Sequence, residues 1–220
     1  MRYLSVILLL ASIEAYGQHS NSPAPYSGSM GTVETFATAD GRPFFPKQYV
    51  DVNGSPNMFD DWATATIHLN NGSVIKNIKT NFNLVSNDLL FLDERGQTMV
   101  ANPSVIKLIE ISDRKFIPTE AGNSYFEVLS TQGKATLLRH TKKVIIETKP
   151  FNSATVQKDF RTKEQVILSV QGNVSEIKSA NDLYNSLGQT DQLKEFVKRE
   201  KLRQKSVDSW IKIVDYYNSI

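Results

Sequence analysis

Two carboxylates and an indole stand side by side near residue 60, and this triplet is the first place to look for chemistry. Asp60, Asp61 and Trp62 lie between the triplets Asn53-Gly54-Ser55 and Asn71-Gly72-Ser73. The carboxylates of a glycosidase converge from separate elements to about 5 to 10 Å, whereas adjacent residues of a strand point to opposite faces. We therefore interpret the triplet as a polar turn that leads into a strand, with Trp62 in the core. Its three residues remain candidates for contact with a ligand or partner.

The three histidines, His19, His68 and His140, are too scattered to form a metal-ligand pattern. The sequence also has no Gly-x-Ser-x-Gly elbow, no phosphate-binding glycine loop and no cysteine nucleophile. A Ser-His-Asp set assembled from distant strands stays open, because triads are recognised by geometry and not by sequence order. His140 is the candidate base in that case. No catalytic residue, metal or cofactor is otherwise predicted.

The first residues have the pattern of a signal peptide. Arg2 precedes an apolar run over residues 4–11, and small residues at Ala15 and Gly17 flank a tyrosine. This run is much shorter than the roughly 20 residues of a membrane-spanning helix, and no later segment approaches that length. We expect residues 1–17 to be cleaved and the remaining chain, without a transmembrane segment, to be exported to the periplasm or the cell surface.

Composition divides the rest of the chain into three parts. Residues 18–42 are predicted to be a flexible leader, because their first half is mainly Ser, Asn, Pro and Gly. Residues 43–178 alternate short apolar runs with turn residues, which predicts an antiparallel β domain. Residues 179–220 are predicted to be a helical tail packed on that domain. The absence of cysteine favours a bacterial exported protein, and the net charge of +2 indicates no nucleic-acid partner.

Glycine-containing turns divide the β region into hairpins. We predict them at Asn71-Gly72, as a type I′ turn, at Glu94 to Gly96, at Gln132-Gly133 and at Gly172-Asn173. Their spacing is not periodic, which disfavours a propeller or solenoid. About ten strands result, too many for one flat sheet. The predicted fold class is therefore mainly β, with antiparallel hairpins closing into a barrel, half-barrel or sandwich, followed by a C-terminal α-helical segment.

The helical tail has one apolar stripe and one basic run. The last helix places Val207, Trp210, Ile211, Val214 and Tyr217 at helical spacing, and such a stripe needs a partner surface. Trp210, Tyr216 and Tyr217 are therefore candidate contacts with this chain or with a partner. The basic run from Lys194 to Lys205 suits an anionic lipid surface or an acidic partner, although a solvated helix face explains it equally well.

Two segments carry a family resemblance. Residues 54–96 contain a Gly-x-Pro, a glycine hairpin and the turn Asp-Glu-Arg-Gly, and residues 193–220 form a lysine-rich tail ending near Tyr-Tyr-Asn. Together they resemble uncharacterised exported proteins of Bacteroidetes-type bacteria. The resemblance implies an envelope location and a β domain with a lysine-rich helical C-terminal tail. It implies no catalytic residue.

The leading functional interpretation is a non-enzymatic binding or scaffold protein of the bacterial envelope, whose partner is an unknown protein or small ligand. One alternative is a periplasmic carrier of small apolar ligands, which requires an unfilled apolar cavity. A second alternative is an exported hydrolase that uses His140, which requires a carboxylate and a hydroxyl within hydrogen-bond reach of the imidazole. A binding module requires neither feature.

Overall fold

The computed structural model describes residues 42–44, 49, 51–119, 124–130, 133–149, 151, 155–188, 191–203 and 205–220. The predicted signal peptide and, apart from Arg42, the predicted leader lie outside these residues and remain predictions.

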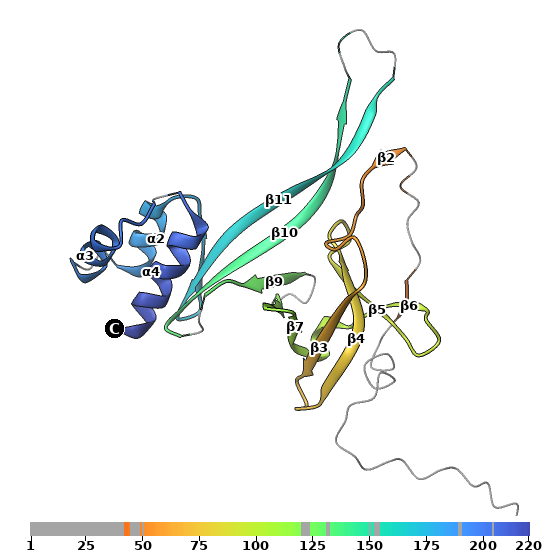
Figure 1. The fold of residues 1–220 in the computed structure, drawn as a ribbon, viewed down its shortest axis with the longest axis horizontal. Helices are drawn as coiled ribbons and strands as arrows, with labels where there is room; N and C mark the ends of the chain where they lie inside the picture. Colours follow the sequence, from red (N-terminus) through yellow and green to blue (C-terminus); the bar gives the residue numbers. More distant parts are fainter. Residues whose placement is uncertain are drawn as a thin grey trace, which may run out of the picture.

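A single 12-stranded sheet is the framework of the molecule (Figure 1). Its strands are β1 (Arg42–Pro43), β2 (Val52–Asn53), β3 (Ala63–Leu69), β4 (Val74–Asn83), β5 (Asp88–Leu92), β6 (Thr98–Val100), β7 (Ile106–Ile111), β8 (Arg114–Pro118), β9 (Tyr125–Val128), β10 (Ala135–Thr148), β11 (Gln157–Val170) and β12 (Asn173–Ile177). A 3-10 turn, η1 (Pro103–Val105), precedes β7.

The strand order is β1-β6-β5-β4-β3-β7-β8-β9-β10-β11-β12, with β2 paired to β11 off this path. Of the pairings described, only β2 with β11 is parallel. The mainly β, antiparallel prediction is confirmed, and the sheet is open because its path ends at β1 and β12.

The open sheet curls until strands far apart in its order meet. The backbone N–H of Lys143 in β10 donates to the carbonyl of Leu84 after β4 at 2.8 Å, although β3, β7, β8 and β9 separate the two strands in the sheet. The Lys143 ammonium also donates to the carbonyls of Ser55 and Asn57. Irregular registers along both edges of β3 contribute to the bend, as bulges do. Of the predicted closures, the half-barrel describes this arrangement.

Two separate cores lie against the sheet. The first fills the half-barrel, where β3 buries Ala65, Ile67 and Leu69 as its alternation predicts. The second lies under the C-terminal helices, where Leu137 of β10 and Leu168 of β11 are fully buried. Strands β10 and β11 contribute buried residues to the second core, and Lys143 of β10 bonds to Leu84 of the half-barrel, so this hairpin joins the two halves of the molecule.

The β3–β4 hairpin departs from its predicted turn type. Gly72 has φ 86, but Asn71 lies outside the positive-φ region. Gly72 N–H donates to Leu69 O, and Leu69 N–H donates to Ser73 O. This is a three-residue loop in which a type I turn is followed by a left-handed glycine. The predicted type I′ turn is therefore wrong here, while the β11–β12 hairpin does have positive φ at both loop residues, Gln171 and Gly172.

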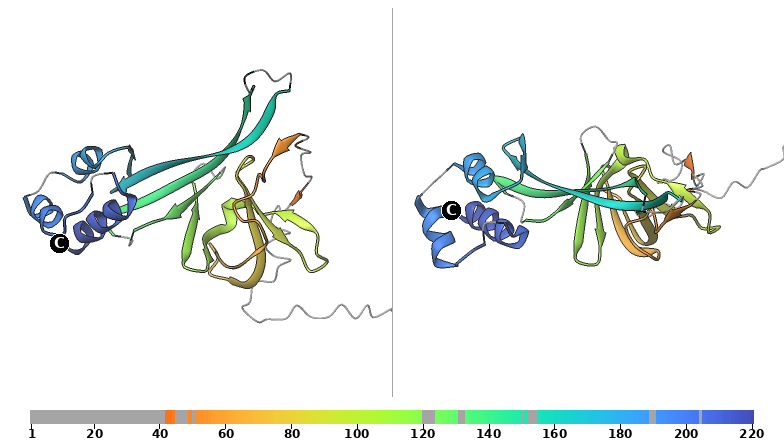
Figure 2. Two further views of the ribbon diagram at one scale, coloured as in Figure 1. Left: turned by 45° about the horizontal axis from the view of Figure 1, so that its top comes forward. Right: turned by 90° about the horizontal axis from the view of Figure 1, so that it is seen from above.

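The hairpin of β10 and β11 is much longer than the sequence indicated. Each strand has 14 residues, paired continuously from Ala135↔Val170 to Thr148↔Gln157. Beyond Lys143 its far half extends past the half-barrel, with β2 paired beside β11 at Lys158 and Asp159, and all three views in Figures 1 and 2 show this extension.

The predicted C-terminal helical segment consists of three helices, α2 (Ala180–Leu187), α3 (Asp191–Arg199) and α4 (Val207–Ser219). Helix α4 lies against β10, where the amide of Asn218 bonds both the N–H and the carbonyl of Ala135. Among the described residues, no helix is long and apolar enough to cross a membrane.

Candidate functional site

A surface groove of about 480 Å³ lies where β5, β6 and η1 meet the start of β9. Its polar lining comes from Arg42, Ser86, Asn87, Asp88, Asn102, Ser104 and Tyr125. The loop between β4 and β5 forms one wall, and its shape is fixed from inside. The buried Asn83 accepts from the N–H groups of Val85 and Ser86 at 3.0 and 3.1 Å, and Asn87 adopts the left-handed conformation with φ 60.

Two buried oxygens beside the groove have no partner among the described residues. They are Oδ1 of Asn87 and the hydroxyl oxygen of Tyr125, a residue that is only 8% exposed. Both residues line the groove. A buried polar atom left without a hydrogen bond costs about 1–3 kcal/mol, so this pair is a place where an incoming hydrogen-bonding group gains free energy.

The electrostatics of the groove keep the phenol protonated. Burial and then the nearby Asp88 carboxylate raise the pKa of Tyr125 well above its ordinary value. The Asp88 carboxylate itself accepts from the Arg42 guanidinium at 3.3 Å. Tyr125 therefore presents a hydroxyl that can donate, and Asn87 presents an oxygen that accepts.

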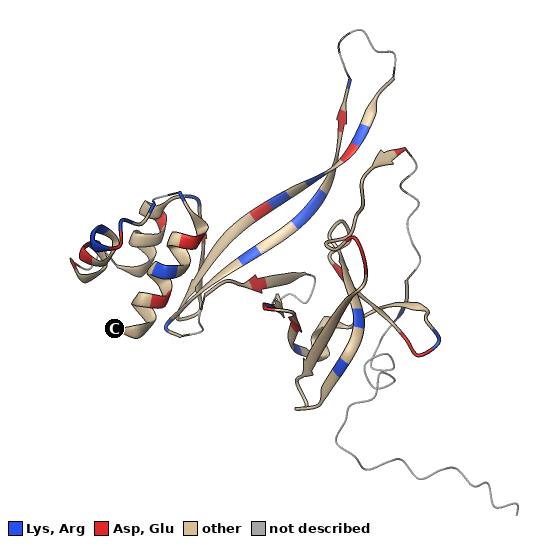
Figure 3. Ribbon diagram, in the orientation of Figure 1, with Lys and Arg blue, Asp and Glu red and all other residues tan. Residues whose placement is uncertain are grey.

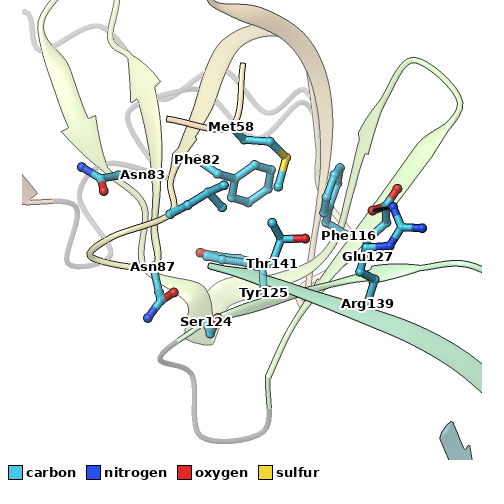
Figure 4. Close-up of a pocket in the computed structure, with 11 residues that line it drawn as sticks. Met58, Phe82, Asn83, Asn87, Phe116, Ser124, Tyr125, Glu127, Arg139 and Thr141 are labelled. Atoms are coloured by element: carbon cyan, nitrogen blue, oxygen red, sulfur yellow. Dashed lines mark ion pairs between the residues drawn. The ribbon is translucent and has the colours of Figure 1, made fainter. Parts of the chain in front are cut away.

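A small cavity lies behind Tyr125, on the inner side of the half-barrel (Figure 4). Met58, Phe82 and Phe116 form its apolar wall, and the phenol oxygen points toward the side on which Asn87 lies. The cavity measures about 20 Å³, which is room for about one water molecule.

A buried ion network closes the other end of the cavity. Arg114 donates to both oxygens of Glu127, at 2.7 and 2.9 Å, and stacks over the ring of Phe116. Arg139 approaches the same carboxylate at 3.7 Å. Glu127 is only 8% exposed, and two partly exposed arginine side chains compensate its charge.

His140 lies in a dyad with a serine. Its Nε2 is 2.7 Å from the Ser124 hydroxyl, and the side chain of Gln165 forms its other hydrogen bond. Burial lowers the pKa of His140, which favours the neutral imidazole. Within the described residues the imidazole thus has a hydroxyl and an amide as partners and no carboxylate. Ser124 is buried and borders the small cavity, so a substrate has no room beside it.

The triplet near residue 60 lies elsewhere, in a loop before β3. Asp60 and Asp61 are exposed and Trp62 is half-buried, so the indole does not reach the fully buried core that its sequence context predicted. Asn81 holds this loop, since its amide accepts from Phe59 N–H and donates to the carbonyls of Phe59 and Asp61. Neither carboxylate lines the groove or the cavity.

The aromatic candidates of the tail belong to the second core. Trp210 is 5% exposed within it, and Tyr217 packs against it. Tyr216 stacks on Phe196 of α3 with ring centroids 4.0 Å apart. The groove residues were missed because Asn, Asp and Ser near turns are ordinary turn-formers. Their one distinguishing signal is Tyr125, an aromatic beside a polar loop, and it meets Asn87 only through the fold.

No cluster of three metal-ligating side chains occurs in the described part of the chain. Comparison of the chain with protein-family models, curated protein sequences and solved structures found no match.

Proposed function

We propose that the chain is a non-enzymatic binding protein of the bacterial envelope whose groove holds a small neutral ligand bearing hydroxyl groups. The observation that carries this proposal is the pair of buried, unpartnered oxygens on Asn87 and Tyr125 beside the groove. A hydroxyl group donates and accepts at once, so ligand hydroxyls can donate to the Asn87 oxygen and accept from the Tyr125 phenol. A saccharide is the ligand class with such groups in number.

The dimensions of the groove suit this class of ligand. Small-molecule sites commonly measure about 300–1,000 Å³, and the groove measures about 480 Å³. Its polar side chains are mostly amides and hydroxyls, and its one carboxylate, Asp88, is already engaged by Arg42. The lining thus favours a neutral polar ligand over an apolar or strongly charged one.

The two alternatives have less support. A carrier of apolar cargo needs an apolar cavity far larger than the cavity of about 20 Å³ behind Tyr125. A hydrolase built on His140 has a serine hydroxyl at 2.7 Å, but Gln165 stands where an orienting carboxylate is required.

The decisive variant is Tyr125→Phe, which removes one oxygen and keeps the ring. Binding is screened on an array of mono- and oligosaccharides and then measured by titration calorimetry with the best-bound sugar. We expect Tyr125→Phe to weaken binding roughly tenfold, the value of one hydrogen bond to a buried group. It leaves the stability of the free protein unchanged or raised, because an unpartnered polar atom is lost.

Tyr184→Phe is the matched control, because it also removes a phenol oxygen. Tyr184 lies in α2, packs against the second core and does not line the groove. Equal affinity of Tyr125→Phe and Tyr184→Phe for the sugar would refute the groove as the binding site. Absence of binding by the unmodified protein to every sugar on the array would refute the ligand class.

A further inference from the structure

Positive charge is concentrated on the far half of the β10–β11 ribbon (Figure 3). Residues 142–163 contain six Lys or Arg and two Asp or Glu, a net charge of +4, while the whole chain has a net charge of only +2. One stretch of the chain therefore carries more positive charge than the molecule as a whole, which makes it a candidate surface for an anionic partner.

Three of these cations share one face of the ribbon. Lys142 and Lys163 are directly opposite each other in the ladder, and Arg161 follows on the same face of β11, opposite Val144. We call Lys142, Arg161 and Lys163 the cationic face. Like charges placed directly opposite each other in a sheet are destabilising, so this face lowers the stability of the ribbon.

Two other cations of the ribbon, Lys143 and Lys158, have partners within the protein. Lys158 forms an ion pair with Glu147 at 3.5 Å, and Lys143 donates to carbonyl groups of the half-barrel. Within the described residues, no residue of the cationic face has an ion-pair partner. Its opposite side, which carries Lys143, is directed at the half-barrel, so the cationic face points away from the rest of the β domain.

The end of the same ribbon exposes large apolar side chains. Phe151 is 96% exposed and Val156 is 45% exposed, and the exposed Lys149 precedes them. Figures 1 and 2 show the adjoining ends of strands β10 and β11 projecting beyond the half-barrel. An aromatic side chain held out in this way has no packing role in the described structure.

We propose that the far half of the β10–β11 ribbon docks on an anionic lipid surface. The ribbon lies along the membrane with its cationic face on the phosphate headgroups, and Phe151 at its end enters the boundary between headgroups and acyl chains. Stable attachment to a bilayer generally needs two signals, and a set of cations together with an inserted apolar group supplies both. An acidic soluble partner would neutralise the cations and leave the projecting phenylalanine unexplained. The proposal does not depend on the groove.

The test is flotation of the purified chain with vesicles of phosphatidylcholine alone or of phosphatidylcholine and phosphatidylglycerol in equal parts. We expect partition onto the anionic vesicles only, weakened by salt. The variant Lys142→Gln, Arg161→Gln, Lys163→Gln should partition on the order of a hundredfold less, because each cation contributes about a fivefold factor at an anionic surface.

The matched control is Lys194→Gln, Lys198→Gln, Lys205→Gln in the tail, which changes the net charge by the same amount and should bind like the unmodified chain. Phe151→Ser should lower partition roughly tenfold at unchanged charge. All variants are made in the same full-length chain, and thermal melting by circular dichroism checks that each is folded.

Equal losses in the two triple variants would overturn the proposal, because the effect would then be one of net charge alone. Binding of inorganic polyphosphate without binding of anionic vesicles would also overturn it, since the surface would then recognise a soluble polyanion. Unchanged partition of Phe151→Ser would refute the insertion of the ribbon end.

Discussion

Two buried asparagine side chains each determine the shape of one loop around the half-barrel. Asn81 and Asn83 are each 3% exposed, and each uses its amide to hold a neighbouring loop. A buried amide is tolerated when its hydrogen bonds are satisfied, and these two supply partners that backbone groups in irregular loops would otherwise lack. The loop before β3 and the wall of the groove therefore depend on single side chains in β4.

The β3–β4 turn gives the first prediction. Gly72→Val should destabilise the protein by about 1–3 kcal/mol, because a β-branched residue is strained at φ 86 even though a Cβ there meets nothing within 4 Å. Asn71→Ala should cost about 1 kcal/mol or less, since it removes only the bond from Asn71 Oδ1 to Ser73 N–H. Urea denaturation measures both. Similar midpoints for the two variants would contradict the observed turn.

The buried ion network gives the second prediction. Glu127→Gln should destabilise the protein by about 3–5 kcal/mol, because it leaves the guanidinium groups of Arg114 and Arg139 without their buried counter-charge. Glu164→Gln is the control, as its carboxylate is half-exposed and its approach to Arg139 is 3.9 Å. Calorimetric melting that shows equal losses for the two would mean that burial of Glu127 does not matter.

The residue scale also shows what the sequence could predict. Turn glycines were recognisable because φ is a local property, and Gly72, Gly96 and Gly172 all have positive φ. Partnership between distant residues was not recognisable: Asn87 and Tyr125 come together only through the strand order. The Ser124–His140 contact could not be predicted for the same reason, because no residue spacing identifies the partners of His140.

At the scale of elements, α2 begins with a capping box. The Ser179 hydroxyl accepts from the N–H of Asp182, and the Asp182 carboxylate accepts from the N–H groups of Lys178 and Ser179. These bonds, with that of Lys178 first, lower the pKa of Asp182. The ionised carboxylate therefore stabilises the folded state at pH values above its ordinary pKa.

The third prediction concerns acid. As the pH falls below the ordinary value of 3.8 toward the lower folded pKa of Asp182, protonation removes this contribution. Asp182→Asn should therefore lose less stability on acidification than the unmodified protein. Thermal melting between neutral and acidic pH measures the difference. Asp191→Asn in α3 is the control, and a matching change in that variant would show that the effect is one of overall charge.

Helix α4 is attached to β10 through one side chain, which gives the fourth prediction. Asn218 bonds the N–H and the carbonyl of Ala135 at 2.9 and 2.8 Å, as a neighbouring strand would. Asn218→Ala should cost about 1–3 kcal/mol by leaving these groups unpaired. Lys212→Ala, on an exposed part of the same helix, should cost much less. A hydrogen-exchange comparison then shows whether the Ala135 amide loses protection only in Asn218→Ala.

Elements were predictable where a pattern repeats within a few residues. The alternation in β3 and the helical stripe of α4 both led to the correct element, because burial on one face imposes a period. The 14-residue length of β10 and β11 was not predictable, since their far halves are paired to each other and largely uncovered. Charged residues there interrupt any apolar period.

At the scale of the molecule, the β10–β11 hairpin links the second core to the half-barrel. The helices cover Leu137 and Leu168 at one end of β10–β11, while Lys143 further along β10 meets the half-barrel. Closure of the sheet could not be predicted, because it depends on curvature accumulated over many strands. Composition did predict a β region followed by a helical region, and the structure shows both.

The fifth prediction follows from this division. Trp210→Ala should destabilise the protein by about 3–5 kcal/mol, because Trp210 is 5% exposed in the second core. Its melting temperature should fall while the protein stays monomeric or retains its original assembly in light scattering. A chain ending at Gly188 should also be less stable. If truncation leaves the stability of the β domain unchanged, the tail is not part of its folding unit.

The position of the two cores along the sequence also imposes an order of events on a chain that is synthesised from its N-terminus. Every buried member of the first core lies between Ala65 and Tyr125, so that core can condense early. The second core needs Leu137, Leu168 and finally Trp210, Ile213 and Val214. Until α4 has been made, the apolar surface around Leu137 and Leu168 stays uncovered beside the folded half-barrel. A chain that lacks the C-terminal helix therefore leaves this apolar surface exposed to solvent.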